Sequence, residues 1–524
     1  MDDTAFDALT RRHVGLAAGG ILASLLGLFT QDAAEADKKK RRRRRKRREK
    51  RRRRRDRNRP CQGAACGNQR PNIVLINVDD MRESDYLALT RTRALLQQQG
   101  ASYPNYFLAT PLCGPSRASL FRGQYAHNHG VLKNNGANGG WNAYHNTGVD
   151  QDTVATWLQA AQYRTAHIGK HINGYRASNR AVGPGWSEWI VPVPVNFFDY
   201  DLNVNGTLEP HGSAARDYLT DVMATKAEAF IASTPTPTPL FLYFAPKAPH
   251  GPATPAPRHA GAFAGHQLDE SGSFNETDMS DKPAYMQRPL LTADQIRDLE
   301  RRERDRLESL LSVDEAIERI VNALQAANRL QNTYIFFVTD NGYLLGQHRH
   351  SGKSVPYEEA IRMSMLVRGP GIAAGSTNDA MVANIDLAPT IAALTGAATP
   401  GVVDGRSLVS TLRGADTGRT ALLIEIFSGA EDDPEEADDV LPEARVAAPS
   451  RRRAIRTADW LYGEYGNPAS EFELYDLHAD SAQLQSQHEN PALAATMAGL
   501  SAWLGTLVNC TGNACRSAEN HPPA

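Results

Sequence analysis

The stretch Pro71-Asn72-Ile73-Val74-Leu75-Ile76-Asn77-Val78-Asp79-Asp80 decides the fold of this chain. Its continuous apolar run is typical of a strand that is buried on both faces, as in a parallel sheet. Further apolar runs follow at 165–169, 240–245 and 333–339, with helical patterns between them. Because strands that alternate with helices form parallel sheets, we predict an α/β protein whose central, mostly parallel sheet lies between helices.

Polar side chains directly follow three of these strands. Asp79 and Asp80 follow the first, Lys170 follows the second, and Asp340 and Asn341 follow the last. Ligand sites in open α/β sheets lie at the carboxyl ends of the strands, so we expect these side chains to meet. Three carboxylates and a carboxamide are hard oxygen ligands, which suit Ca²⁺ or Mg²⁺ better than zinc.

The segment Cys113-Gly114-Pro115-Ser116-Arg117 precedes a short helix that Gly123 ends. If the helix begins at Pro115, its first N–H groups point at Cys113 and favour an anion there. A buried cysteine in a strand-to-helix turn is the alternative. Arg117, together with His250 in a proline-rich loop and with Lys353, adds positive charge for an oxyanion.

The pattern changes at about residue 420, where short strands replace the long apolar runs. Four strand-like runs and one helical segment make up this part: 421–426, 454–456, 460–464, 472–476 and 491–507. We predict a large domain over 69–419 and a smaller C-terminal domain over 420–524, with an antiparallel sheet and a helix.

The N-terminus has the features of an export signal. Thr10-Arg11-Arg12-His13-Val14 precedes an apolar run that ends at Phe29, and Ala34-Glu35-Ala36 offers a cleavage site. Paired arginines before a Gly- and Ala-rich stretch favour the twin-arginine translocase, so we predict a signal peptide over 1–36 and an exported protein. An uncleaved anchor is the alternative, although the run is shorter than the ~20 residues of a membrane span.

A polybasic segment follows the signal. Residues 38–59 hold 19 Lys or Arg and two acids, whereas 60–524 hold 37 basic and 51 acidic residues. Such a segment repels itself, so we predict a disordered linker over 37–68. A nucleic-acid arm is the alternative, but no aromatic residues for base stacking lie between the basic ones. We therefore expect contact with an anionic cell envelope and no nucleic acid.

Four of the five cysteines flank the folded body in two pairs, and the fifth is Cys113. The pairs are Cys61 with Cys66 and Cys510 with Cys515. In an exported protein they indicate two disulfides, either as local loops or as a clasp between the termini. Cys113 is left over and is therefore a candidate reactive residue.

Together these motifs resemble the sulfatase family of the alkaline-phosphatase superfamily. The family motif is Cys-x-Pro-Ser-Arg followed by a helix and Thr-Gly, and here Cys113–Arg117 and Gly123 match it. The resemblance covers nearly everything from Pro71 to the C-terminus. Other matching segments are Tyr125-Ala126-His127-Asn128-His129-Gly130, Gly169-Lys170, Ala248-Pro249-His250, Asp340-Asn341-Gly342 and Arg456-Thr457-Ala458-Asp459-Trp460-Leu461-Tyr462.

The resemblance implies a sulfuric ester hydrolase whose large, alkaline-phosphatase-like domain is catalytic. A separate formylglycine-generating enzyme would oxidise Cys113 to formylglycine (3-oxoalanine), and a hydroxyl of the hydrated aldehyde would attack sulfur. Ca²⁺, or Mg²⁺ as the alternative, would hold the hydrated group. The implied metal ligands are Asp79, Asp80, Asp340, Asn341 and residue 113.

The resemblance also assigns roles to the cationic residues. Arg117 would stabilise the hydrated formylglycine. Lys170, Lys353 and His250 would stabilise charge on the sulfate oxygens and the leaving oxygen, with His250 or Lys353 as the acid.

Two further segments resemble one group within the family. Gly169-Lys170-His171-Ile172-Asn173-Gly174-Tyr175 and Pro184-Gly185-Trp186-Ser187-Glu188-Trp189 resemble segments of N-acetylglucosamine-6-sulfatases and related heparan-type sulfatases. They imply that the substrate is a sulfated sugar of the glycosaminoglycan type, either a sulfated polysaccharide or a small molecule. An aryl sulfate is the alternative substrate. Two positions depart from the family: Arg122 replaces a threonine, and His171 lies one residue before the usual histidine and is left out of the site.

Two other functions remain open at this point. A phosphodiesterase or phosphonate monoester hydrolase of the same superfamily would act on a related anion, although a cysteine in this motif favours a sulfatase. A non-catalytic cell-surface binding protein would use the basic tail and the acidic body.

Overall fold

The computed structural model describes residues 70–176, 178, 180–270, 272–399, 401–414, 418–427 and 448–522. The predicted signal peptide (1–36) and almost all of the remaining N-terminal segment, including Cys61 and Cys66, lie outside these residues. Within the described part of the chain, no helix is long and apolar enough to span a bilayer.

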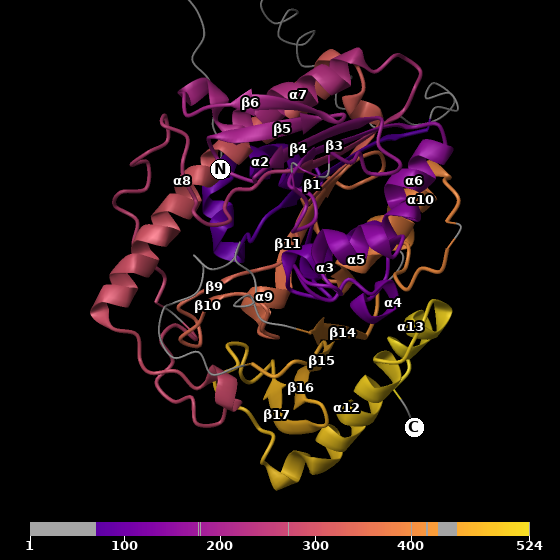
Figure 1. The fold of residues 1–524 in the computed structure, drawn as a ribbon. Helices are drawn as coiled ribbons and strands as arrows, with labels where there is room; N and C mark the ends of the chain where they lie inside the picture. The colour runs from indigo at the N-terminus through magenta and orange to yellow at the C-terminus, as the bar shows by residue number, and fades with distance from the viewer. Residues whose placement is uncertain are drawn as a thin grey trace, which may run out of the picture. The chain divides into compact units, whose positions relative to one another are not determined.

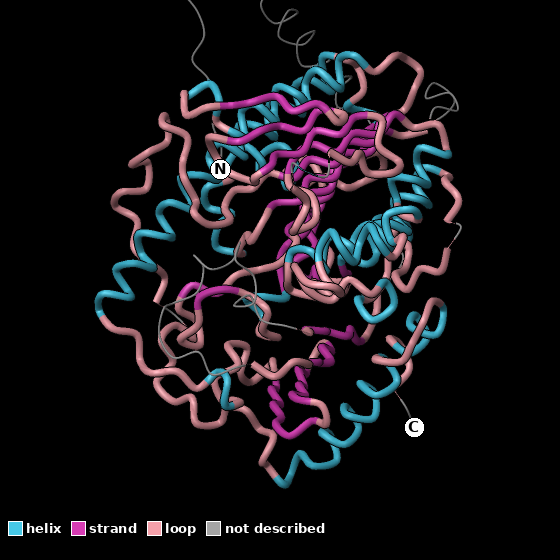
Figure 2. Tube along the Cα trace, in the orientation of Figure 1, coloured by secondary structure: helices cyan, strands magenta, loops and turns pink. Residues whose placement is uncertain are grey.

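A large mixed sheet runs through the centre of the described body, with helices on both sides (Figures 1 and 2). Its middle consists of five parallel strands, in the order β8 (Thr333–Thr339), β1 (Asn72–Val78), β7 (Leu240–Ala245), β3 (Arg164–Gly169) and β4 (Glu188–Val193). Antiparallel neighbours flank it: β11 (Arg362–Arg368) and then β2 (Ala101–Phe107) beyond β8, and β5 (Tyr200–Val204) and β6 (Thr207–His211) beyond β4. Two short strands, β12 (Ser376–Thr377) and β13 (Val382–Ala383), pair in parallel with β2.

The register of the parallel strands aligns their carboxyl ends. Val78 of β1 pairs with Thr339 of β8, and Gly169 of β3 pairs with Ala245 of β7. Every residue of β1, β7 and β8 is buried, which explains why these strands are apolar throughout. The residues that directly follow these strands therefore lie at the same edge of the sheet.

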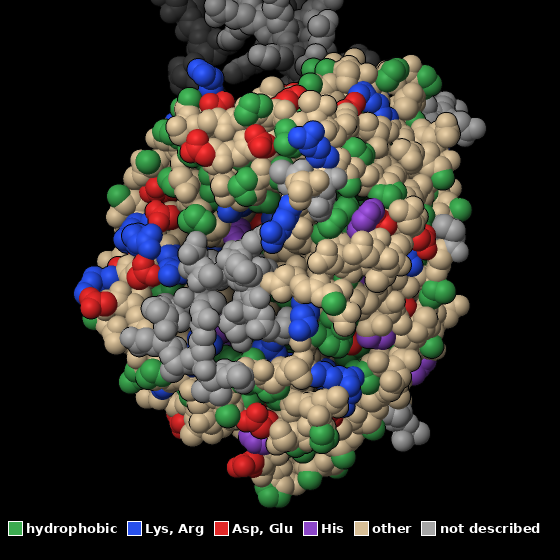
Figure 3. All heavy atoms as spheres, viewed as in Figure 1, with side chains coloured by type: hydrophobic (Ala, Val, Ile, Leu, Met, Phe, Trp, Pro, Cys, Tyr) green, Lys and Arg blue, Asp and Glu red, His purple; other side chains and the backbone are tan. Residues whose placement is uncertain are grey.

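Helices cover both faces of this sheet. In Figure 1, α3 (Cys113–Arg122), α5 (Gly140–Asn146), α6 (Val154–Ala160) and α10 (Leu387–Thr395) form one group, and α7 (Leu219–Ser233) packs against α8 (Ala293–Ala326) in the other. The long helix α8 begins at a capping box between Thr292 and Gln295. Its exposed side carries acidic and basic side chains together, as the left edge of Figure 3 shows, and Arg301 pairs there with Asp298 and Asp305.

The C-terminal part forms a separate antiparallel sheet with helices. Its strands are β14 (Ala421–Ile426), β15 (Arg452–Thr457), β16 (Trp460–Gly466) and β17 (Ala469–Asp476), followed by α12 (Ala494–Leu507) and α13 (Asn513–Ala518). The predicted fold class is therefore confirmed. The boundary at residue 420 stays a prediction, because apolar residues of both sheets share one buried cluster.

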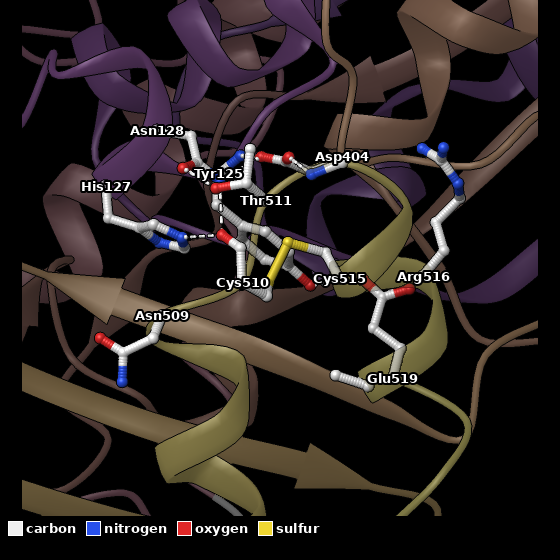
Figure 4. Close-up of a disulfide and its surroundings, with 12 residues drawn as sticks. Tyr125, His127, Asn128, Asp404, Asn509, Cys510, Thr511, Cys515, Arg516 and Glu519 are labelled. Atoms are coloured by element: carbon white, nitrogen blue, oxygen red, sulfur yellow. Dashed lines mark hydrogen bonds between the residues drawn. A yellow bond between two sulfur atoms is a disulfide. The ribbon is translucent and has the colours of Figure 1, made fainter.

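The C-terminal cysteines form the local disulfide Cys510–Cys515 (Figure 4). The carbonyl oxygen of Cys510 accepts hydrogen bonds from Nε2 of His127 (2.9 Å) and Nδ2 of Asn128 (3.0 Å). The disulfide loop thus contacts the segment that follows α3. Of the two predicted arrangements, the structure contains the local loop at this end of the chain.

Candidate active site

The structure brings all nine predicted site residues together at the carboxyl edge of the large sheet, and all nine are buried. They come from six segments: the ends of β1 and β8, the first turns of α3, the residues after β3 and β7, and the residue after β10 (Ser351–Gly352). The nine residues are Asp79, Asp80, Cys113, Arg117, Lys170, His250, Asp340, Asn341 and Lys353.

Cys113 lies at the centre of this group. Its Sγ is 3.5 Å from Oδ1 of Asp79, 3.7 Å from Oδ1 of Asp80 and 3.5 Å from Oδ1 of Asn341. Nζ of Lys353 donates to the same sulfur at 3.0 Å. Four polar groups thus face the thiol of this buried cysteine.

The predicted start of the helix needs a correction. Helix α3 begins at Cys113 itself, with Leu112 as the extended residue before it, and ends at Gly123 in the left-handed conformation (φ 67°). Cys113 thus lies in the first helical turn and does not precede it. The N–H of Gly114 donates to Oδ1 of Asn134 at 2.8 Å.

Two lysines pair with the two carboxylates at the end of β1. Nζ of Lys170 lies 2.6 Å from Oδ2 of Asp79, and Nζ of Lys353 lies 2.6 Å from Oδ1 of Asp80. Burial raises the pKa of Asp79, but the charges of Lys170, His250, Arg117 and Lys353 outweigh burial and hold it well below its usual value. Asp79 is therefore a carboxylate despite its burial.

Arg117 joins the ends of β1 and β8. Its Nε donates to Oδ2 of Asp340 at 2.9 Å, and its Nη2 lies 3.5 Å from Oδ1 of Asp79. The other oxygen of Asp340 accepts from the N–H groups of Asp80 (3.2 Å) and Asn341 (2.9 Å). Burial and the nearby charge of Asp79 raise the pKa of Asp340 to about 6, against the opposing effect of Arg117.

Both site lysines follow a glycine that turns the chain into the site. Gly169, before Lys170, has φ 122°, and Gly352, before Lys353, has φ 124°. A Cβ at Gly169 would lie 2.1 Å from the carbonyl oxygen of Ala245, so only glycine fits beside β7. Lys353 itself leaves the short hairpin of β9 (Leu344–Leu345) and β10.

The donor set fits a divalent cation. Atoms of Asp79, Asp80, Cys113 and His250 that could bind a metal all lie within 4.8 Å of one another. Among the described residues, Oδ2 of Asp80 accepts no hydrogen bond although it is buried, and His250 Nε2 lies 3.7 Å away. An unsatisfied buried carboxylate oxygen beside other oxygen donors is what a hard cation requires.

Sequence reasoning missed Tyr243, which contacts a predicted site residue. Tyr243 accepts a hydrogen bond from Nδ2 of Asn77 (2.9 Å), and its hydroxyl lies 3.4 Å from Nη1 of Arg117. Tyr243 lies within an apolar strand, where nothing distinguishes it from a core residue. His171, which was left out of the site, packs in an aromatic cluster with Trp141 and Trp189. Its Nδ1 lies 3.0 Å from Nε2 of His167.

The sulfatase family model matches residues 71–397, and a model described as N-sulphoglucosamine sulphohydrolase, C-terminal, matches 346–509. The chain belongs to the sulfatase family. The predicted family is confirmed, and neither alternative function is favoured by these matches.

Relatives support the same assignment. An N-acetylglucosamine-6-sulfatase from Capra hircus is 32% identical over 88% of this chain and 87% of its own length. An extracellular sulfatase SULF-1 homolog from Drosophila melanogaster is 34% identical over 75% of this chain, but the chain spans only 36% of that protein. A solved structure in complex with its substrate D-glucosamine-2-N,6-O-disulfate shares the fold, with a TM-score of 0.70, 24% identity, and coverage of 87% of this chain and 99% of that one.

Proposed function

We propose that this protein hydrolyses sulfate esters, with the residue derived from Cys113 as its nucleophile. The observation that carries the proposal is the position of the Cys113 thiol, which Asp79, Asp80, Asn341 and Lys353 surround at 3.0 to 3.7 Å. Conversion of Cys113 to formylglycine by a separate maturation enzyme would supply a hydrated aldehyde, whose hydroxyl is a nucleophile that a thiol does not provide.

A divalent cation would be held by the oxygens of Asp79, Asp80, Asp340 and Asn341 beside residue 113. All four side chains are hard oxygen donors, which suit Ca²⁺ or Mg²⁺. Ca²⁺ is the proposed ion because of the resemblance to the sulfatase family, and Mg²⁺ is the alternative. When bound, the cation would supply positive charge that stabilises an oxyanion at position 113. Both oxygens of Asp340 already accept hydrogen bonds, from Arg117 and from two backbone N–H groups.

The cationic side chains would bind the sulfate group and move the proton. Lys170 and Lys353 would stabilise its oxygens. Nδ1 of His250 lies 2.9 Å from the carbonyl oxygen of Gly251, which can only accept, so Nδ1 carries a proton and Nε2 is the atom that exchanges one. His250 or Lys353 would protonate the leaving oxygen, and Arg117 would hold the nucleophile in place.

The proposed substrate is a sulfated sugar of the glycosaminoglycan type, in line with the N-acetylglucosamine-6-sulfatase relatives. The relatives named extracellular support export, for which the paired arginines at Arg11 and Arg12 would recruit the twin-arginine translocase. This route carries folded proteins and would allow maturation of Cys113 before export. The polybasic segment would then contact an anionic cell envelope.

A parallel assay tests this function. We expect kcat/KM for 4-nitrophenyl sulfate to exceed that for 4-nitrophenyl phosphate by at least about 100-fold, since a site matched to one transition state discriminates by several kcal/mol. Protein co-expressed with a formylglycine-generating enzyme is used, and a Cys113→Ala preparation controls for contaminating hydrolases. A preference for phosphate would support the phosphodiesterase alternative, and hydrolysis of neither ester would support a binding protein.

A further inference from the structure

Arg306 lies outside the predicted site but contacts the backbone of two of its segments. This residue of α8 is buried, with 4% of its surface exposed. Its Nη2 donates to the carbonyl oxygen of Asp80, and its Nη1 donates to the carbonyl oxygen of Pro249 at 3.3 Å. Pro249 directly precedes His250, so one guanidinium bridges the chain at Asp80 and the chain at His250.

The two bridged segments leave neighbouring strands of the large sheet. Asp80 follows β1 and the His250 loop follows β7, and these strands pair in parallel. Asp80 has φ 62°, a left-handed conformation that costs a non-glycine residue about 1 kcal/mol. Its N–H is held by Asp340 and its carbonyl oxygen by Arg306, so hydrogen bonds on both sides maintain this conformation.

Arg306 is itself held in one orientation. Oδ2 of Asp85 lies 3.1 Å from its Nη2, while the other oxygen of Asp85 accepts from Arg82. The ring of Tyr343 lies beneath the guanidinium, 4.6 Å from its Cζ to the ring centroid. A planar guanidinium can donate to two carbonyl oxygens and a carboxylate at once, whereas an ammonium on a flexible stem lacks this fork.

We infer that Arg306 is a positioning residue that holds the backbone at Asp80 in place relative to the His250 loop, and thereby orients the Asp80 ligand and sets the affinity of the site for its cation. The inference rests on the proposed function. Nε2 of His250 lies 3.7 Å from Oδ2 of Asp80, and both side chains belong to the cluster that could hold a metal. The bonds of Arg306 to these two segments go to the carbonyl oxygens of Asp80 and Pro249, so they act on the two side chains through the backbone.

If Arg306 has a purely structural role, its ion pair with Asp85 is one of several that join α8 to the segment after β1. Glu303 offers the matched comparison, because it lies one turn earlier on α8, is equally buried and pairs with Arg82 at 2.6 Å. No bond of Glu303 to Asp80 or Pro249 occurs among the described residues. Replacing Glu303 therefore disturbs the same ion-pair network without releasing the two carbonyl oxygens.

Calcium titration of the purified full chain by calorimetry separates these roles. We expect Arg306→Gln and Arg306→Lys to raise the Kd for Ca²⁺ at least about 10-fold, as loss of a group that orients metal ligands typically does. Arg306→Lys keeps the charge beside Asp85 and so preserves folding. Glu303→Gln should change the Kd by less than about 2-fold, even if its Tm falls as much as the Tm of the Arg306 variants.

The following results would overturn this inference. Equal Kd shifts in the Arg306 and Glu303 variants, or no shift in any variant, would make Arg306 structural. A wild-type Kd in Arg306→Lys would contradict the requirement for a planar fork. If the wild-type protein hydrolyses sulfate esters while the Arg306 variants bind Ca²⁺ normally, only this inference fails. If the wild-type protein neither hydrolyses sulfate esters nor binds Ca²⁺, the proposed function itself fails.

Discussion

Cys113→Ala is expected to reduce kcat/KM for an aryl sulfate by at least about 10⁴-fold, or about 5.5 kcal/mol of transition-state stabilisation. Alanine cannot be converted to formylglycine, so the proposed nucleophile is lost. The surrounding charges of Lys170, Lys353 and Arg117 remain and would account for any residual rate. Initial rates at saturating Ca²⁺ measure this effect.

The matched control is Ser119→Ala, about 1.7 turns further along α3. Ser119 is buried like Cys113, but its Oγ pairs with Nε2 of His129 at 2.9 Å and belongs to a different contact. We expect it to lower stability by about 1 kcal/mol while kcat/KM stays within about 3-fold. Activity of Cys113→Ala comparable to that of the control would refute a role for residue 113 in catalysis.

Asp80→Asn is expected to weaken Ca²⁺ binding by at least about 100-fold and to reduce kcat/KM by at least about 10³-fold. Asp80 supplies a buried oxygen with no hydrogen-bond partner among the described residues, and its charge also pairs with Lys353. An amide at this position keeps the shape but removes the charge that a hard cation requires. The site is then left with an excess of positive charge from Lys353 and Lys170.

The thermal shift caused by Ca²⁺ measures this loss apart from activity. At a free concentration of 100 times Kd, a bound ion stabilises the folded protein by about 2.7 kcal/mol. We expect that shift in the wild-type protein and at most about 0.4 kcal/mol in Asp80→Asn at the same Ca²⁺ concentration. After chelation, added Ca²⁺ should restore the activity of the wild-type protein but not that of Asp80→Asn. Added Mg²⁺ serves as the comparison ion. Full wild-type activity after exhaustive chelation would exclude a metal-dependent mechanism.

The sequence predicted the layers of the fold because long apolar runs leave few alternatives. β1, β7 and β8 are buried on both faces, and only a parallel sheet between helices buries such strands. The strand order and the antiparallel flanks β11 and β5 were not predictable, since pairing depends on contacts between distant residues. The start of α3 was wrong by two residues because Pro115 fits within a first turn as well as at its beginning.

The site was predictable where chemistry and position coincide. Acidic residues directly after a buried strand, and a lone cysteine at the start of a helix, can be recognised in the sequence. Tyr243 and Arg306 do not, because one lies in an apolar strand and the other in a long charged helix. Their roles depend on which atoms they meet in the folded chain, and no local pattern encodes those contacts.

Mass spectrometry of the peptide that contains Cys113, combined with activity, tests the central claim most directly. In protein co-expressed with a formylglycine-generating enzyme, we predict a residue that has lost sulfur and two hydrogens and gained one oxygen. Across preparations with different extents of conversion, the rate of sulfate release should be proportional to the converted fraction. A preparation that releases sulfate at the full rate with only the unmodified thiol at Cys113 would contradict the account.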